Sequence, residues 1–302
     1  MVASSTDYRS SLRVGLIQTN CPSEYWSMPA TKKAVYSDEL WNYIKGCFAA
    51  FLVGQERPDI VLLPELALPR YRIFQLQSMA LRLGIIVIAG LDYILNSKKL
   101  EVANEAVVII PDNWQTKTFG HYCQQIRVGK IYPAPKELEE LEKRGFKFKQ
   151  ETVYYLFDAH ELGRFGVAIC YDLMDLERAA LYGGFIQHLF VLAYNQDTQS
   201  FFQIAEAFSR VMFCNVVICN TGHFGGSVAI APYYRPWKRL VYRHEGARLA
   251  TSQVIELPVR ELVKAQGGEH TTISVPSEEQ LFKNRPPQFE SRVVASVVEE
   301  EI

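Results

Sequence analysis

The sequence predicts an α/β protein, in which buried strands alternate with helices along one large domain. Short apolar runs rich in valine and isoleucine recur along the chain and are typical of strands covered on both faces. Segments with helical periodicity lie between many of these runs. Hydrophobic residues make up 48% of the 302 residues, which is enough for a substantial core. Residues 12–262 contain no internal repeat or low-complexity linker, so we expect one domain there, built as an α/β sandwich.

The strands are predicted from apolar runs that end at turn residues or charges. Residues 12–18 form the first of them, and residues 58–65, which end in Leu-Leu-Pro-Glu, form the second. Four consecutive apolar residues in the second run predict a strand that is buried on both faces. Further strands are predicted at residues 85–89, 106–110, 153–157, 165–169, 188–193, 216–219, 228–231 and 254–257.

The helices are predicted from apolar residues that recur on one face. In residues 37–55, Leu40, Ile44 and Phe48 share such a stripe, and Ser37 or Asp38 can cap the first turn. Other helices are predicted at residues 71–82, 135–143, 172–182 and 200–213. Helices are sparse between residues 96 and 158, so we expect some hairpin-like pairing there.

Both ends of the chain differ in character from the predicted domain. Residues 1–11 are predicted to be a flexible N-terminus. After residue 262 the chain contains a Gly-Gly pair, an Asn-Arg-Pro-Pro run and a glutamate-rich end. We predict that residues 263–302 form an extended C-terminal tail that could contact a partner subunit.

Composition and charge narrow the class of protein. The net charge of -1 argues against electrostatic capture of nucleic acid or of an acidic membrane surface. No apolar run reaches the roughly 18 residues of a membrane-spanning helix, and the N-terminus lacks the apolar core of a signal peptide. The six cysteines are scattered without a Cys-x-x-Cys pair, which is typical of reduced thiols. These features predict a soluble cytoplasmic protein.

Cys170 occupies the most suggestive position in the sequence. It follows the predicted strand 165–169 and precedes the predicted helix 172–182. A turn of this kind lifts one side chain clear of the sheet edge, and the helix dipole favours an anion there. We therefore expect a larger thiolate fraction, the form that attacks carbon. The alternative is a core cysteine that only ends a buried strand.

Glu65 and Lys130 are two further candidates for chemistry. Glu65 ends an apolar strand, where a carboxylate either reaches solvent or is buried with a partner. Lys130 lies between a polar run and a proline turn, and by itself it is consistent with a surface lysine. Spacing alone makes Arg127 and Lys136 equally plausible.

Three stretches together resemble the nitrilase (carbon–nitrogen hydrolase) superfamily. They are Leu-Leu-Pro-Glu65, Gly-Lys130-Ile-Tyr-Pro and Gly-Val-Ala-Ile-Cys170-Tyr-Asp, in that order. The resemblance covers most of the chain. It implies a four-layer α-β-β-α sandwich, and a homodimer formed through the helices that follow Cys170 and Phe201. It also implies a catalytic Glu-Lys-Cys set, and hydrolysis of a small amide, carbamoyl or nitrile compound without a cofactor.

The resemblance assigns a role to each residue of this set. Cys170 would form a thioester, and Glu65 would act in turn as base and acid. The Lys130 ammonium and the backbone N–H of Tyr171 would stabilise the oxyanion of the tetrahedral intermediate. A second glutamate, Glu137, could assist the lysine. Glu139 and Glu140 qualify for the same part by their distance along the chain. Alternatively, Glu137 lies on a solvated face of the predicted helix 135–143.

Other functions remain open from the sequence. A nitrilase-like domain could serve as an interaction or sensing module with little or no turnover. A Cys-His-Asp hydrolase could use one of His121, His160, His188 or His223. The histidines lack metal-ligand spacing, so no metal site is predicted. The basic, aromatic segment 235–248 is either an anion or nucleic-acid patch or a strand pair with solvated arginines. Loop 195–199 is expected to form part of the pocket wall.

Overall fold

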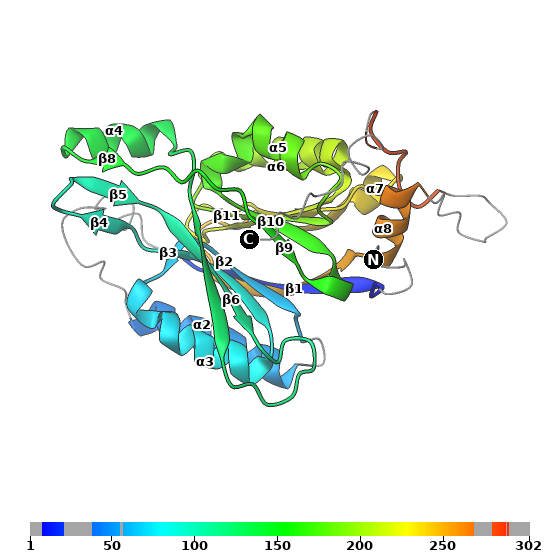
Figure 1. The fold of residues 1–302 in the computed structure, drawn as a ribbon, viewed down its shortest axis with the longest axis horizontal. Helices are drawn as coiled ribbons and strands as arrows, with labels where there is room; N and C mark the ends of the chain where they lie inside the picture. The colour runs from blue at the N-terminus through cyan, green and yellow to red at the C-terminus, as the bar shows by residue number, and fades with distance from the viewer. Residues whose placement is uncertain (1–7, 21–37, 55–56, 269–279, 288, 290–302) are drawn as a thin grey trace, which may run out of the picture.

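The computed structural model describes residues 8–20, 38–54, 57–268, 280–287 and 289. Figure 1 shows two β-sheets stacked face to face between two layers of helices. Helices α2 (Asp38–Val53) and α3 (Ile73–Leu83) cover one sheet. Helices α5 (Leu176–Tyr182) and α6 (Thr198–Phe208) cover the other. The predicted four-layer α-β-β-α sandwich is therefore confirmed.

The first sheet has the strand order β15-β1-β2-β3-β6-β7. Its strands are β1 (Ser11–Gln18), β2 (Ile60–Leu68), β3 (Ile86–Leu91), β6 (Glu105–Pro111), β7 (Cys123–Gly129) and β15 (Thr251–Pro258). β1, β2 and β3 are parallel, whereas β6, β7 and β15 pair antiparallel to their neighbours. The carboxyl ends of the three parallel strands consequently meet at one edge of the sheet, and Glu65 stands in the second half of β2 near that edge.

The second sheet has the strand order β14-β13-β12-β11-β10-β9. Its strands are β9 (Leu156–Asp158), β10 (Arg164–Ile169), β11 (His188–Ala193), β12 (Asn215–Asn220), β13 (Ser227–Ile230) and β14 (Leu240–His244). β10, β11 and β12 are parallel, and α5 and α6 lie in the crossovers between them. Cys170 follows β10 directly, so it also lies at the carboxyl edge of parallel strands.

A small third sheet stands beside α4 (Pro135–Lys143) at one end of the molecule (Figure 1). It consists of β4 (Ile94–Asn96), β5 (Glu101–Ala103) and β8 (Lys147–Phe148). β4 pairs antiparallel with β5, and β6 with β7. The hairpin-like pairing predicted between residues 96 and 158 is thus confirmed.

Alternate residues of the buried strands contribute to two hydrophobic cores. In β2, Ile60 and Leu62 lie in the core between the sheets, together with Val167 of the second sheet. Val61 and Leu63 belong to the other core, which the sheet forms with α2 and α3. Successive side chains of a strand point to opposite faces. Both faces of β2 are covered, and for this reason all nine of its residues are buried.

Several elements differ from those predicted. The predicted helix 172–182 is divided into a 3-10 turn η4 (Cys170–Met174) and α5, because the Asp175 side chain accepts the backbone N–H of Glu177 and caps α5. The last turn of the predicted helix 200–213 is a π-helical turn η5 (Ser209–Phe213). β9 begins at Leu156 and not at residue 153. β7 was not predicted, since it carries exposed polar residues within the strand. β14 lies in segment 235–248, where a strand pair was one of the two alternatives.

The C-terminal part of the domain continues beyond the boundary predicted at residue 262. Helix α8 (Arg260–Gly267) crosses it, and the Gln266 side chain donates to the backbone oxygen of Phe213 at 2.8 Å. A third core consists of Phe213, Leu262, Phe282 and Phe289. The described residues of the predicted tail therefore pack on their own chain. Contact of this segment with a partner subunit stays a prediction.

The described residues at the N-terminal end are also tied to the domain. Of the predicted flexible segment 1–11, residues 1–7 lie outside the described part, as does the candidate cap Ser37. Arg9 binds Asp59, with 2.9 Å between Nη1 and Oδ1, and Arg260 Nε donates to the backbone oxygen of Tyr8 at 2.7 Å. Residues 8–10 are thus part of the folded domain.

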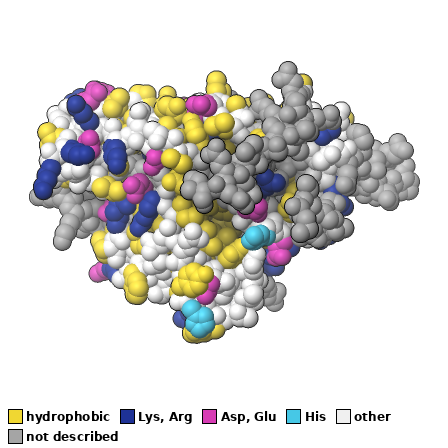
Figure 2. Space-filling view, viewed as in Figure 1, with side chains coloured by type: hydrophobic (Ala, Val, Ile, Leu, Met, Phe, Trp, Pro, Cys, Tyr) yellow, Lys and Arg dark blue, Asp and Glu magenta, His cyan; other side chains and the backbone are white. Residues whose placement is uncertain are grey.

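The surface carries a basic region at one end. Figure 2 shows Lys and Arg side chains gathered over α4 and the small sheet. Lys143, Arg144 and Lys147 belong to this part of the chain. None of the helices within the described ranges is both long and apolar enough to cross a membrane.

Candidate active site

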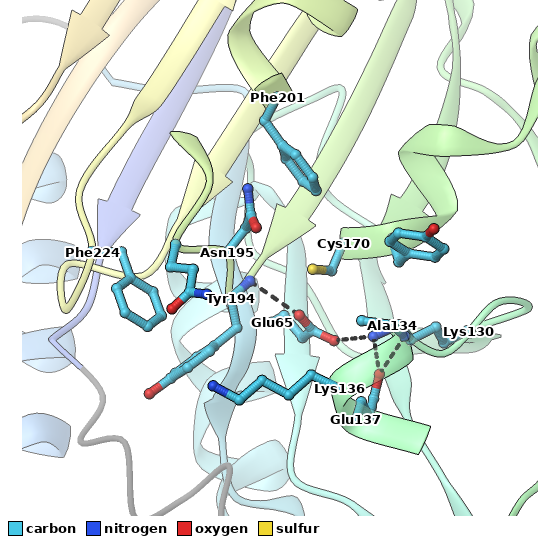
Figure 3. A pocket seen from close by; sticks show the side chains of 12 residues that line it. Glu65, Lys130, Ala134, Lys136, Glu137, Cys170, Tyr194, Asn195, Phe201 and Phe224 are labelled. Carbon is cyan, nitrogen blue, oxygen red and sulfur yellow. Dashed lines mark hydrogen bonds and ion pairs between the residues drawn. The ribbon is translucent and has the colours of Figure 1, made fainter. Parts of the chain in front are cut away.

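The two sheets bring Glu65, Lys130 and Cys170 to a single cavity of about 200 Å³ (Figure 3). Glu65 comes from β2, and Lys130 follows the edge strand β7 of the same sheet. Cys170 comes from the second sheet, at the end of β10. Glu137 and Tyr171 line the same cavity. All five of the predicted site residues therefore converge, although the chain separates Glu65 from Cys170 by more than a hundred positions.

Backbone geometry places the Glu65 carboxylate in the interior. Leu66, the next residue, has φ 58°, and the β2–β3 register shifts between Leu63 and Leu68. This distortion turns Glu65 out of the regular pleat. Gly90 of β3 makes room for it, because a Cβ at Gly90 would overlap the backbone at Pro64 and Glu65.

Three donors hold the buried Glu65 carboxylate. The Asn104 side chain donates to Oε1 at 2.7 Å, and Lys130 Nζ donates to the same oxygen at 2.9 Å. The backbone N–H of Tyr194, just beyond β11, donates to Oε2 at 3.0 Å. Since each oxygen has a partner, the carboxylate is fixed in orientation as well as position. Asn104 was not predicted from the sequence, where it is a single Asn between two short strands.

Lys130 stands between two carboxylates. Its Nζ lies 2.9 Å from Glu65 Oε1 and 2.6 Å from Glu137 Oε2, and only 2% of the residue is exposed. Burial alone would lower the pKa of Lys130, but the carboxylates of Glu137 and Glu65 outweigh it and raise this pKa well above its ordinary value. Lys130 is therefore a permanent ammonium and not a base.

Glu137 is a buried part of this cluster, so its assignment to a solvated helix face is wrong. Only 3% of it is exposed. Pro135 begins α4, and at this helix end Glu137 Oε2 accepts the backbone N–H of Ala134 at 3.1 Å. Tyr93 donates its hydroxyl to Glu137 Oε1 at 2.7 Å. Burial would raise the pKa of Glu137, yet Lys130 and Tyr93 outweigh it and hold this pKa below the usual value.

Cys170 is the residue where β10 turns into η4. Its φ of 50° lies in the left-handed region, which is rare for a residue with a side chain and typical of strained turns at functional sites. The side chain points into the cavity beside Glu65 and Phe201 (Figure 3). The backbone N–H of the next residue, Tyr171, is the one that such an elbow offers to an oxyanion.

The expected rise in thiolate fraction is not found. Burial raises the pKa of the Cys170 thiol well above its ordinary value, and the Glu65 carboxylate raises it further. The Lys130 ammonium and the Tyr194 backbone N–H act in the opposite direction without reversing the shift. The turn that follows Cys170 is a short 3-10 turn and not the start of an α-helix, so the dipole that we invoked is weak. At rest, the side chain of Cys170 is therefore a neutral thiol.

Asp172 ties the lysine loop to the cysteine turn. Its Oδ1 accepts the backbone N–H of Tyr132 at 2.8 Å and that of Ile131 at 3.1 Å, and its Oδ2 accepts from Ile169 at 3.3 Å. The guanidinium of Arg178 lies 3.4 Å from Oδ2. Burial raises the pKa of Asp172 to about 6 in spite of Arg178. Asp172 therefore fixes Lys130 and Cys170 relative to each other, a role that the sequence did not reveal.

The histidine-based alternative finds no support in this geometry. None of His121, His160, His188 and His223 lines the cavity. His188 is buried at the other end of its strand, where it bonds to the backbone oxygen of Leu162 and to Asn215. Within the described residues no group of three or more His, Cys, Asp or Glu side chains is arranged to hold a metal ion.

Two other sequence expectations can be placed in the structure. Asn195 and Gln196 line the cavity, so loop 195–199 contributes to its wall as predicted. Segment 235–248 contains a short helix, α7 (Pro236–Arg239), and β14. Two of its arginines pair within the chain, Arg239 with Glu206 at 3.8 Å and Arg243 with Glu245.

No family model and no curated protein sequence matches this chain. Solved structures do match it. Nit3 from Saccharomyces cerevisiae, described as a member of branch 10 of the nitrilase superfamily, gives a TM-score of 0.62 at 15% identity, over 91% of this chain and 99% of its own. XC1258 from Xanthomonas campestris, described as a CN-hydrolase superfamily protein, gives a TM-score of 0.58 at 14% identity, over 86% of this chain and 95% of its own.

An amidase from Nesterenkonia sp. AN1 gives a TM-score of 0.56 at 16% identity, over 86% of this chain and 96% of its own. That structure is of a single-residue mutant of the amidase, and it shows covalent addition of the acetamide moiety of fluoroacetamide at the active-site cysteine. All three relatives are matched over nearly their whole length. The chain therefore has the fold of the nitrilase superfamily.

Proposed function

We propose that this protein hydrolyses the carbon–nitrogen bond of a small non-peptide amide, carbamoyl or nitrile compound through a thioester on Cys170. The observation that carries this proposal is the convergence of a thiol, an ammonium and two carboxylates from distant parts of the chain at one cavity (Figure 3). The fold shared with an amidase that has an active-site cysteine supports it.

For an amide, acylation begins with proton transfer. Because the Cys170 thiol is neutral at rest, a base must remove its proton as the Sγ–C bond forms, and the Glu65 carboxylate is that base. The carbonyl oxygen becomes an oxyanion that the Lys130 ammonium and the Tyr171 backbone N–H stabilise. Glu65 then returns the proton to the nitrogen, the C–N bond breaks, and ammonia leaves an acyl group on sulfur.

Deacylation uses the same groups in reverse. Glu65 takes a proton from water, whose oxygen attacks the thioester carbon, and the oxyanion forms again at the same donors. The C–S bond breaks and the proton returns to sulfur. Amide and water are converted into carboxylic acid and ammonia, and the thiol is restored.

The surrounding residues keep these groups in place. Asn104 and Tyr194 orient Glu65. Glu137, which accepts the Tyr93 hydroxyl, holds Lys130 from the other side. Fixed donors of this kind act without reorganisation during the reaction, and the loss of one oxyanion donor typically costs about 3 kcal/mol of barrier.

The cavity favours a short substrate. Its volume of about 200 Å³ corresponds to the space of about seven water molecules. Phe201, Phe224 and Tyr194 provide its aromatic walls. A small linear acyl chain fits such a space, whereas a folded polypeptide does not.

A panel of small amides and nitriles tests the proposal through ammonia release. We expect turnover by the wild-type protein and none by Cys170→Ser, while Cys123→Ser keeps wild-type activity because Cys123 lies outside the cavity. In a parallel experiment, fluoroacetamide should alkylate Cys170 with loss of fluoride, as detected by peptide mass spectrometry.

Two outcomes would contradict the proposal. Ammonia release that survives Cys170→Ser would place the chemistry elsewhere. Labelling of Cys170 without turnover of any compound would favour the alternative, a nitrilase-like interaction or sensing module.

A further inference from the structure

A second cavity, of about 40 Å³, lies where α6, η5, α7 and the segment 280–287 meet. Three cationic residues line it, Arg210, Arg239 and Lys283, together with Glu206. It shares no residue with the active-site cavity, and α7 and α4 lie at opposite ends of the molecule (Figure 1). We propose that this cavity binds a phosphate group, either as the free ion or at the end of a small metabolite. This site does not depend on the proposed function.

Bonds to the backbone hold the two arginines at the cavity. Arg210 Nη1 donates to the backbone oxygen of Asn284 at 2.9 Å. Arg239 donates from Nε to the backbone oxygen of Tyr233 and from Nη2 to that of Tyr234, both at 3.1 Å. These acceptors are neutral, so the bonds orient each guanidinium group and leave its charge uncompensated.

The segment that carries Lys283 is anchored to the domain. The preceding residue, Phe282, is only 1% exposed and belongs to the third core. Its ring stacks on that of Tyr233, with 5.1 Å between the centroids. The backbone N–H of Tyr234 donates to the backbone oxygen of Leu281 at 2.9 Å. The side chain of Lys283 therefore starts from a defined point beside the cavity.

Positive charge exceeds negative charge around this cavity. Among the described residues that line it, Glu206 is the one carboxylate, and its Oε1 lies 3.8 Å from Arg239 Nη1. Neither Arg210 nor Lys283 forms an ion pair with another residue in the described part of the chain. Three cations and one carboxylate leave an excess of two positive charges.

The cations oppose one another in their present surroundings. Burial lowers the pKa of Arg210, and the charge of Arg239 lowers it further. Burial also lowers the pKa of Lys283, as do Arg239 and Arg210, although Glu206 acts in the opposite direction. An anion placed between these groups would remove the repulsion and stabilise their charged forms.

The size of the cavity limits the kind of anion. Its volume of about 40 Å³ is little more than the roughly 30 Å³ of one water molecule, so a compact charged group enters and a carbon chain does not. Glu206 is exposed, so the cavity opens to solvent, where the rest of a larger ligand would lie. Guanidinium groups match the oxygens of phosphate, and the excess charge matches a dianion better than chloride or a carboxylate.

Calorimetric titration of the full chain with inorganic phosphate, at constant ionic strength, tests the site. We expect Lys283→Met to weaken binding about tenfold, because a charge-assisted hydrogen bond is lost. Glu206→Gln should tighten binding about threefold, because it removes a carboxylate that repels the ligand, and a misfolded variant would not show such a gain. Lys149→Met, at an exposed lysine outside the cavity, should leave the affinity unchanged.

Phenyl phosphate separates the two sources of the phosphate group. If it binds as tightly as inorganic phosphate, the group belongs to a larger metabolite; if inorganic phosphate alone binds, the ligand is the free ion. Three results would overturn the site: no binding of either compound, equally tight binding of acetate or chloride, or a phosphate affinity that neither Lys283→Met nor Glu206→Gln changes.

Discussion

At the scale of single residues, the site depends on a buried ammonium enclosed by two carboxylates. Removing one partner of such a buried pair leaves an uncompensated charge, which typically costs about 3–5 kcal/mol. Glu137 therefore supports the fold as well as the proposed chemistry. Its third donor, the Tyr93 hydroxyl, is the least disruptive place to test this arrangement.

We predict that Tyr93→Phe lowers kcat about tenfold and leaves KM nearly unchanged, because Glu137 then positions Lys130 less firmly. The free energy of unfolding should fall by about 1–2 kcal/mol, since one buried acceptor loses its donor. Steady-state kinetics and urea unfolding measure the two effects. Tyr122→Phe, at an exposed tyrosine, is the control. A wild-type kcat in Tyr93→Phe would show that this hydroxyl has no positioning role.

A second residue-scale prediction concerns His188 and pH. Burial lowers the pKa of His188 to about 4, although its bond to the Leu162 backbone oxygen opposes this shift. An unfolded chain binds the proton near pH 6.5. Neutral His188 therefore makes its full contribution to the free energy of unfolding above pH 6.5. This contribution is lost as the pH falls from 6.5 towards 4, by on the order of 3 kcal/mol.

Urea unfolding between pH 7 and 4.5 measures this dependence. We expect His188→Gln to flatten the curve relative to wild type and the exposed His121→Gln to leave it unchanged. The difference between the curves isolates His188 from Asp172, whose pKa of about 6 gives the opposite slope. Parallel curves for His188→Gln and wild type would contradict the prediction.

At the scale of elements, the close approach of β3 to β2 controls where Glu65 stands. A Cβ at Gly90 would overlap the backbone of Pro64 and Glu65, and neither strand can move without disturbing a core. The glycine is therefore a requirement of the site and not only of the sheet.

We predict that Gly90→Ala lowers the free energy of unfolding by about 2–3 kcal/mol through overpacking and abolishes turnover. Gly46→Ala is the matched control, because nothing lies within 4 Å of a Cβ at that position in α2. It should stabilise the protein by about 0.5–1 kcal/mol, as alanine favours a helix. Thermal unfolding and ammonia release measure both variants, and an active, stable Gly90→Ala would refute the close approach.

The helices and strands could be predicted where burial repeats with a clear period. β2 and β11 contain continuous apolar runs, at residues 60–63 and 189–193, and both strands were predicted. β7 was not predicted, because Gln124 and Gln125 interrupt the apolar residues of this edge strand. The division of helix 172–182 depends on the Asp175 cap and on the 3-10 turn at Cys170, and a 3.6-residue period does not distinguish these from one helix.

The sequence predicted the side chains proposed to take part in the chemistry, but not the residues that hold them in place. Glu65, Lys130 and Cys170 stand in recognisable motifs, whereas Glu137 was a candidate only by its distance from Lys130 along the chain. Asn104 and Tyr93 act through contacts between segments that are distant in sequence, so no local pattern marks them. Asp172 stands in the motif around Cys170, but its contact with the backbone of Tyr132 could not be predicted from that motif. The protonation state of Cys170 was predicted wrongly because its burial could not be read from the strand pattern.

At the scale of the whole molecule, we propose that two copies associate through the outer helical layer that contains α5 and η5. The resemblance implies this homodimer, and Leu176 and Val211, 75% and 61% exposed, present apolar side chains there. Exposed apolar groups of this kind are typical of protein–protein contacts.

We predict that Leu176→Asp combined with Val211→Asp turns the dimer into a monomer, as measured by size-exclusion chromatography with light scattering. Phe74→Asp places the same charge at a residue that is 77% exposed, on α3 in the opposite layer (Figure 1), and should leave the dimer intact. A monomeric wild-type protein, or a dimer that only Phe74→Asp disrupts, would refute this interface.

The proposed nucleophile, Cys170, and its proposed base, Glu65, come from different sheets. Glu65 and Lys130 belong to one sheet and Cys170 to the other. The distance between the Cys170 sulfur and the Glu65 carboxylate therefore depends on how the two sheets are aligned. A shear of even one ångström between them would separate sulfur from carboxylate while every strand stayed intact. The apolar core between the sheets therefore sets the distance between sulfur and carboxylate. Substitutions in this core far from the site would change the rate of the proposed reaction before they changed the fold.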